Sequence, residues 1–169
     1  GPADAIREHV LSHPALSVAL LTLHIEWMSQ RHFQESIRGD GDLDPQFKSL
    51  LLHHWQEEHQ HAQLDTLMCE MIAENMSQSA IDDAIDGYLA LGGFLDDGLK
   101  QQAIFDMEAF MAVTGRVFTD AERARFVDVQ HQANRWTYIG SGMTRPNFLE
   151  TLGGLNPSKR RMIESVSSG

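Results

Sequence analysis

The chain has few turn signals, and long stretches with helical periodicity separate them. Tight turns are predicted from Gly39 to Asp44 and from Gly115 to Thr119, where glycine is followed by a helix-capping residue. Between these turns the apolar residues recur every three or four positions, and no stretch alternates apolar and polar residues as a strand does. The sequence therefore predicts an all-α fold.

Capping residues place the boundaries of the predicted helices. Pro14 stands before the first long helix, and Asp44 followed by Pro45 begins the second. Gly115 ends a further long helix, and Thr119 caps the next one. The predicted long helices span 15–38, 45–75, 94–114 and 120–139, with a shorter helical piece from Ser77 that ends at Gly92-Gly93, and two short terminal helices over 146–153 and 157–165.

Length and composition favour one globular domain. A chain of 169 residues, 42% of them hydrophobic, can bury one core, so we expect a single domain over residues 1–169 with its helical bundle at about 15–140. The net charge of −11 argues against a nucleic-acid partner or an anionic membrane surface and is compatible with cation binding. The sequence has no membrane-span or signal-peptide pattern and a single cysteine, Cys69, and these features together predict a cytoplasmic protein.

An acid-x-x-His motif occurs in the second predicted helix, at Glu58 and His61. Residues i and i+3 of a helix lie on one face about 5 to 6 Å apart, so this carboxylate and imidazole can bind one metal ion together. Glu26 lies as far before the midpoint of the first turn, near residue 42, as Glu58 lies after it, so an antiparallel hairpin puts the two carboxylates level. His54, one turn before Glu58, is an extra ligand, a partner that hydrogen-bonds to a ligand, or a core histidine.

A similar motif occurs in the predicted helix over 120–139, at Asp128 and His131. The second turn has its midpoint near residue 117, so the residue level with Asp128 should fall near position 106. Asp106 and Glu108 both lie there, and either can point toward the motif. Each acid-x-x-His motif thus has a single upstream carboxylate at its own level.

Two such pairs with two single carboxylates resemble the ligand set of the ferritin-like di-iron carboxylate superfamily, in which two helices of a four-helix bundle each carry a Glu and two carry Glu-x-x-His. The resemblance covers about residues 16–139. It implies a ferritin-like bundle with a long crossover, over about 75–91, between its second and third helices. Glutamate is the usual ligand of this family, which favours Glu108 over Asp106, and Asp128 departs from the family by replacing a glutamate. The implied ligands of two Fe or Mn ions are Glu26, Glu58, His61, Glu108, Asp128 and His131.

Three functions are compatible with these residues. The first, implied by the resemblance, is an O2-dependent oxidoreductase, an oxygenase or oxidase acting on a small-molecule substrate. The second is a ferroxidase or iron-storage subunit that takes ferrous iron and O2. The number of subunits in the assembly distinguishes these two functions, because iron storage needs a large shell of subunits, whereas an enzyme is more often a monomer or homodimer. The third is a metal-free helical module for binding or scaffolding, in which the acidic residues and histidines lie on solvent-exposed helix faces.

Overall fold

Every regular element is a helix in the computed structural model, which describes residues 3–167. The all-α prediction is therefore confirmed for this part of the chain. The α-helices are α1 (Ala3–Leu11), α2 (Ala15–His32), α3 (Pro45–Ala73), α4 (Gln78–Thr114), α5 (Asp120–Arg135), α6 (Ser141–Met143), α7 (Pro146–Leu155) and α8 (Pro157–Ser167). Two π-helical segments, η1 (Phe33–Ile37) and η2 (Trp136–Gly140), continue α2 and α5.

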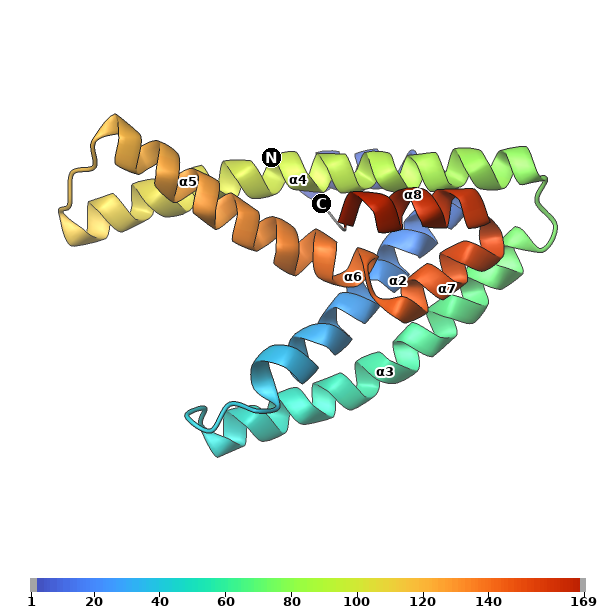
Figure 1. Ribbon diagram of the computed structural model, residues 1–169, viewed down its shortest axis with the longest axis horizontal. Coiled ribbons are helices and arrows are strands. Elements are labelled where there is room, and N and C mark those ends of the chain that lie inside the picture. The colour runs from blue at the N-terminus through green and yellow to red at the C-terminus, as the bar shows by residue number, and fades with distance from the viewer. Residues whose placement is uncertain (1–2, 168–169) are drawn as a thin grey trace.

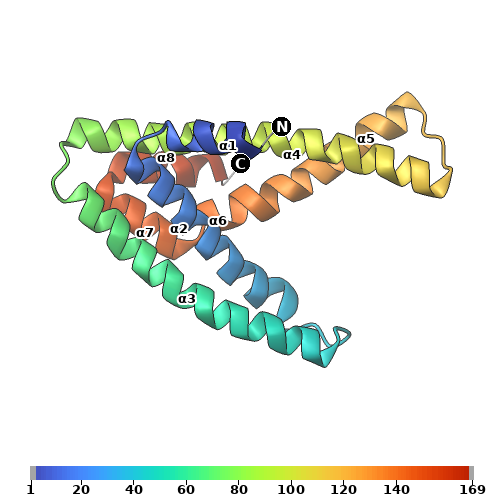
Figure 2. The ribbon, with the colours of Figure 1, turned by 180° about the vertical axis from the view of Figure 1, so that it is seen from behind.

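Two helical hairpins form the long arms of the molecule. Helices α2 and α3 pack along each other, α4 packs against α5, and the two pairs diverge from the region where α6, α7 and α8 gather (Figures 1 and 2). Helix α7 contacts α2, α3 and α8, and so it braces the base of the first hairpin. The outer ends of both hairpins extend away from this common base.

The predicted caps are present at both hairpin turns. The Asp44 carboxylate accepts hydrogen bonds from the backbone N–H groups of Gln46 and Phe47, and Thr119 forms a capping box with Glu122. Gly115 ends α4 with a positive φ of 69°, a conformation that glycine adopts without steric cost. The local sequence therefore determines where both hairpins turn.

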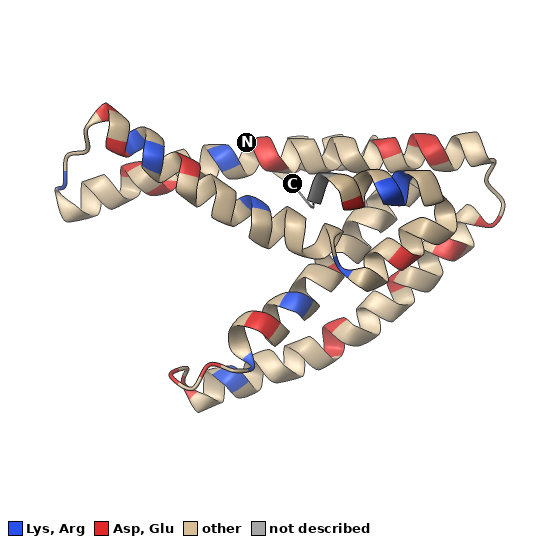
Figure 3. Cartoon of the chain, in the orientation of Figure 1, with Lys and Arg blue, Asp and Glu red and all other residues tan. Residues whose placement is uncertain are grey.

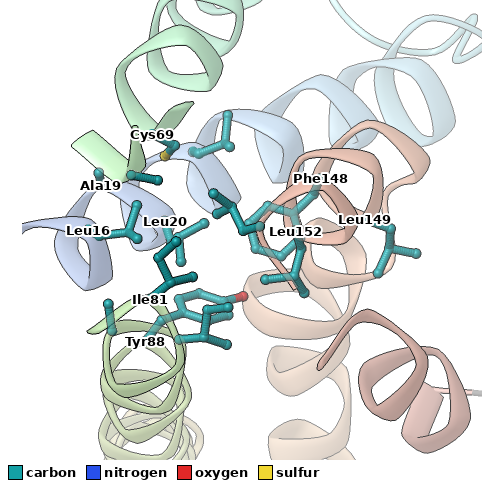
Figure 4. Close-up of a cluster of buried hydrophobic side chains, with 14 of the residues drawn as sticks. Leu16, Ala19, Leu20, Cys69, Ile81, Tyr88, Phe148, Leu149 and Leu152 are labelled. Atoms are coloured by element: carbon teal, nitrogen blue, oxygen red, sulfur yellow. The ribbon is translucent and has the colours of Figure 1, made fainter. Parts of the chain in front are cut away.

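The hydrophobic core lies at the base of the hairpins (Figure 4). Fully buried side chains from α2, α3, α4 and α7 meet there, and the inner face of α7 packs across α2 and α4. The core residues that Figure 4 labels are Leu16, Ala19, Leu20, Cys69, Ile81, Tyr88, Phe148, Leu149 and Leu152. Because hydrophobic burial is concentrated at the base, most of the packing energy is expected there.

A buried polar network joins α2 to α4 and to the middle of η2. His24 Nε2 lies 3.1 Å from the carbonyl oxygen of Tyr138, which can only accept, so this nitrogen carries the proton. Nδ1 then accepts from the hydroxyl of Tyr88 at 2.7 Å. Burial lowers the pKa of His24 to about 4, which keeps the ring neutral. Gly142 of α6 packs so closely on this ring that a Cβ there would lie 2.4 Å from a ring carbon of His24.

The predicted helix break at Gly92-Gly93 is wrong, because α4 runs without interruption from Gln78 to Thr114. Each glycine costs a helix about 1 kcal/mol relative to alanine, and the burial of neighbouring Tyr88 and Leu91 outweighs that cost. Helical backbone likewise continues through Gly140 and Gly142, beyond residue 139 where the predicted helix over 120–139 ends. The two terminal helices are confirmed, whereas α1 was not predicted.

The ferritin-like arrangement is not confirmed by the packing within this chain. A closed four-helix bundle would pack both hairpins along their full lengths, but they diverge (Figure 1).

The basic residues are few and scattered over the helices among more numerous acidic ones (Figure 3). Among the described residues, no helix is both long and apolar enough to span a membrane.

Candidate metal centre

The candidate centre lies in the α2–α3 hairpin, whose two helices are held in register by contacts toward its outer end. The Gln30 side-chain amide donates to the carbonyl oxygen of Trp55 at 2.9 Å, and Phe33 stacks on the Trp55 indole with a centroid distance of 5.2 Å. Gln30 is 1% exposed, so this hydrogen bond satisfies a buried amide. The register that results puts Glu26 level with Glu58, as the turn symmetry predicts.

Glu26, Glu58 and His61 come together across the two helices. Each offers a ligand atom, and these atoms all lie within 4.8 Å of one another. It is the one such group of three or more His, Cys, Asp or Glu side chains found among residues 3–167. The carboxylate of Glu58 contacts two imidazoles: His61 Nδ1 lies 2.9 Å from one of its oxygens, and His54 Nδ1 lies 3.1 Å from the other.

The two carboxylates titrate very differently. Burial first, and then the hydrogen bond and negative charge of Glu58, raise the pKa of Glu26 to about 8. The pKa of Glu58 is lowered, chiefly because Glu26 donates a hydrogen bond to it. The hydrogen bond to Glu58 raises the pKa of His61. Near neutral pH the carboxylate pair therefore holds one proton, in a position that a cation could occupy instead.

The other predicted ligands do not join this group. Glu108 and Asp128 are exposed on the α4–α5 hairpin. His131 Nε2 instead contacts the carboxylate of Asp96 on α4 at 2.7 Å, and Arg135 lies 3.0 Å from the same carboxylate oxygen. The alternative ligand of the second motif, Asp106, accepts a hydrogen bond from the Gln102 side chain at 2.8 Å. The structure thus gathers the first three predicted ligands and separates the other three from them.

A pocket of about 300 Å³ adjoins the candidate centre. Glu58 and His54 form part of its wall, and the rest is mainly apolar or aromatic. Both π-helical segments contribute to it, and such segments are frequent at functional sites. The lining residues are Met28, Ser29, His32, Phe33, Ile37, Leu51, His54, Trp55, Glu58, Thr137 and Tyr138.

Sequence reasoning missed this pocket because its walls come from segments that are distant in the chain. By sequence alone a tryptophan such as Trp55 is most simply interpreted as core packing, and nothing in the sequence places Thr137 and Tyr138 near Glu58. The π-helices have no turn or proline signature either. A hint lay in the stripe Leu51, His54 and Glu58, where polar groups interrupt an otherwise apolar helix face. Comparisons of this chain with protein-family models, with curated proteins and with solved structures find no match.

Proposed function

We propose that the protein binds iron or manganese through Glu26, Glu58 and His61 and is a metal-dependent oxidoreductase acting on a small, largely apolar molecule. The observation that carries this proposal is the convergence of two carboxylates and an imidazole from two helices, beside a pocket. Glu26 lies 32 positions before Glu58 in the chain, so its carboxylate joins Glu58 and His61 only through the register of the two helices. The residues present therefore fit a bound metal ion.

The donor set narrows the choice of metal. It contains carboxylate oxygen and imidazole nitrogen without thiolate, which suits Fe²⁺ or Mn²⁺ better than a structural zinc site. His54 and His61 each contact one oxygen of Glu58, so they fix the orientation of this carboxylate. The proton that Glu26 and Glu58 share would leave when a cation binds.

The pocket supports an enzyme rather than an iron-storage subunit, because ferrous ions need no apolar cavity. Its volume suits a small organic molecule. Bound iron or manganese would supply O2 reduction, which is implied by the resemblance to di-iron carboxylate proteins.

Metal loading tests the proposal. The protein is incubated with Fe²⁺ without oxygen, desalted and assayed for metal by mass spectrometry. We expect the wild-type protein to retain iron and Glu58→Ala to lose most of it. The matched control is Glu57→Ala, which removes the exposed neighbouring carboxylate and should retain iron. Equal iron in both variants, or none in the wild-type protein, contradicts the proposed centre.

A further inference from the structure

The α2–α3 hairpin supplies half of the ligand set of a paired carboxylate centre. Such a centre takes one Glu from each of two helices and Glu-x-x-His from each of two others. This hairpin contributes one of each, as Glu26 and the Glu58-His61 pair. The α4–α5 hairpin does not bring the other half to it, since Glu108 and Asp128 are exposed on the diverging arm.

Apolar side chains on α3 extend on both sides of this half-set. We call four of these apolar side chains the α3 stripe: Leu50, Leu64, Met68 and Met71. Together with His54 and His61 they follow one another at intervals of three, four or seven residues, so all six lie on one helix face. Leu50, Leu64 and Met71 are 64%, 62% and 65% exposed. Apolar side chains gathered on one exposed face mark a surface that a partner covers.

We propose that a second copy of this chain docks on the α3 stripe about a two-fold axis, and that its Glu26, Glu58 and His61 complete a two-metal centre with those of the first copy. A two-fold interface apposes the same surface of both copies. The stripe then meets an identical stripe, and each half-set of ligands meets an identical half-set. Two α2–α3 hairpins also provide the four helices that this ligand set requires.

Charge favours an identical copy over another apolar partner. Two copies bring four glutamates to the interface, and two divalent cations neutralise their four negative charges. An unrelated apolar helix would cover the α3 stripe but would bring no ligands, and it would leave Glu26 and Glu58 buried without a cation. Buried carboxylates without a counter-charge are strongly unfavourable. The pairing is therefore expected to depend on metal.

Because this inference rests on the proposed metal-binding function, the test measures metal uptake and assembly on one sample. The full chain is titrated with Mn²⁺, while light scattering gives the molar mass and paramagnetic resonance reports the manganese. We expect a dimer at one Mn²⁺ per chain, with the spectrum of an exchange-coupled manganese pair. Chelation should return the protein toward the monomer.

Two exposed leucines of α3 provide a matched pair of variants. Leu64→Glu places a charge in the α3 stripe without touching a ligand, whereas Leu52→Glu places one on a different face of the same helix, at a leucine 37% exposed. Leu64→Glu should remain monomeric, weaken Mn²⁺ binding by roughly tenfold or more, and lose the coupled spectrum. Leu52→Glu should behave as the wild type. Helical circular dichroism confirms that both variants fold.

The outcomes separate the two proposals. A wild-type monomer that binds Mn²⁺ through Glu58, or a dimer that Leu64→Glu leaves intact, overturns the shared centre but not the metal site. A dimer that depends on Leu64 yet takes up no Mn²⁺ or Fe²⁺ overturns the proposed function and the completed centre together. Capture of a different apolar helix by the metal-free protein, with no dimer at any Mn²⁺ concentration, also overturns the shared centre.

Discussion

The α2–α3 and α4–α5 hairpins have the same parts, and they differ in how far their helices stay in register. Each has a capped turn, an acid-x-x-His motif and an upstream carboxylate. In α2–α3, Gln30 contacts Trp55, and Glu26 lies level with Glu58 as the turn midpoint predicts. In α4–α5 the turn midpoint predicts that position 103 lies level with His131. The observed partner of His131 is instead Asp96, which lies seven residues farther from the turn.

Helix crossing explains the difference. Near the second turn the register is as expected, and Phe110 packs on Phe126 with a centroid distance of 6.0 Å. Further from the turn α5 leans across α4 (Figure 1), so levels counted from the turn no longer correspond. Turn symmetry therefore locates partners only while two helices run alongside each other. A buried connection such as Gln30 with Trp55 enforces that condition in α2–α3.

The largest expected effect contrasts the packing of the two hairpins. Leu23 of α2 is fully buried at the base, whereas Phe105 of α4 is 54% exposed. Leu23→Ala should lower the free energy of unfolding by about 2–5 kcal/mol, because it leaves a cavity. Phe105→Ala should change it by about 0.5 kcal/mol or less, as at most surface sites. Urea denaturation measures both, and a similar loss in the two variants would mean that Phe105 is covered in solution.

The next effect concerns the junction where α2 meets α4 and η2. His24 is neutral in the folded state because burial lowers its pKa to about 4, whereas the unfolded chain titrates at 6.5. The unfolded state therefore binds the extra proton between these values, and stability present above pH 6.5 is lost as the pH falls toward 4. The 2.5-unit difference corresponds to about 3 kcal/mol.

Denaturation across this pH range measures the slope, with His24→Gln as the control. Its amide can still accept from the Tyr88 hydroxyl and donate to the Tyr138 carbonyl, but it does not titrate. The variant should lose less stability than the wild type between pH 6.5 and 4. An unchanged slope would assign the pH dependence to other groups.

Metal affinity sharpens the comparison between the two motifs. His61→Ala removes an imidazole from the candidate centre and should weaken Mn²⁺ binding by roughly ten- to a hundredfold. His131→Ala removes an imidazole that contacts Asp96, so Mn²⁺ affinity should stay the same. Isothermal titration calorimetry distinguishes them. Loss of affinity in both variants would restore the second motif as part of the centre.

The smallest expected effects lie at the two turns. Asp44→Ala removes the N-cap of α3, and Thr119→Ala removes the N-cap of α5, so each should cost about 1 kcal/mol. Hydrogen exchange should speed up in the first turn of the affected helix in both variants. Because Asp44 begins the helix that carries the candidate ligands, we expect Mn²⁺ affinity to fall slightly in Asp44→Ala and not in Thr119→Ala.

The sequence was sufficient for the features that local chemistry determines. Helical periodicity predicted the all-α class, and Asp44, Gly115 and Thr119 marked the turns that are observed. The symmetric first turn identified Glu26 and Glu58 as neighbours. These predictions depend on residues close in sequence, or on one hairpin whose helices stay parallel.

Features set by tertiary packing were not accessible in the same way. The glycines at Gly92-Gly93 signal a break, yet burial of α4 on both sides keeps it helical. The crossing of α5 over α4 depends on how η2 and α6 pack against α2, as at Gly142 and His24. The pocket beside Glu58 depends on the same packing, because Tyr138 reaches it from the far end of the chain. Single-sequence patterns carry no information on such contacts.

The most direct test of the central claim is to locate the metal by anomalous X-ray diffraction from crystals of the manganese-loaded protein. We predict two anomalous peaks related by a two-fold axis, each within about 2.5 Å of oxygen or nitrogen atoms of Glu26, Glu58 and His61, as in first-row metal sites. Peaks at His131 and Asp96 instead, or no peak in the α2–α3 hairpin of crystals that contain stoichiometric manganese, would contradict the account.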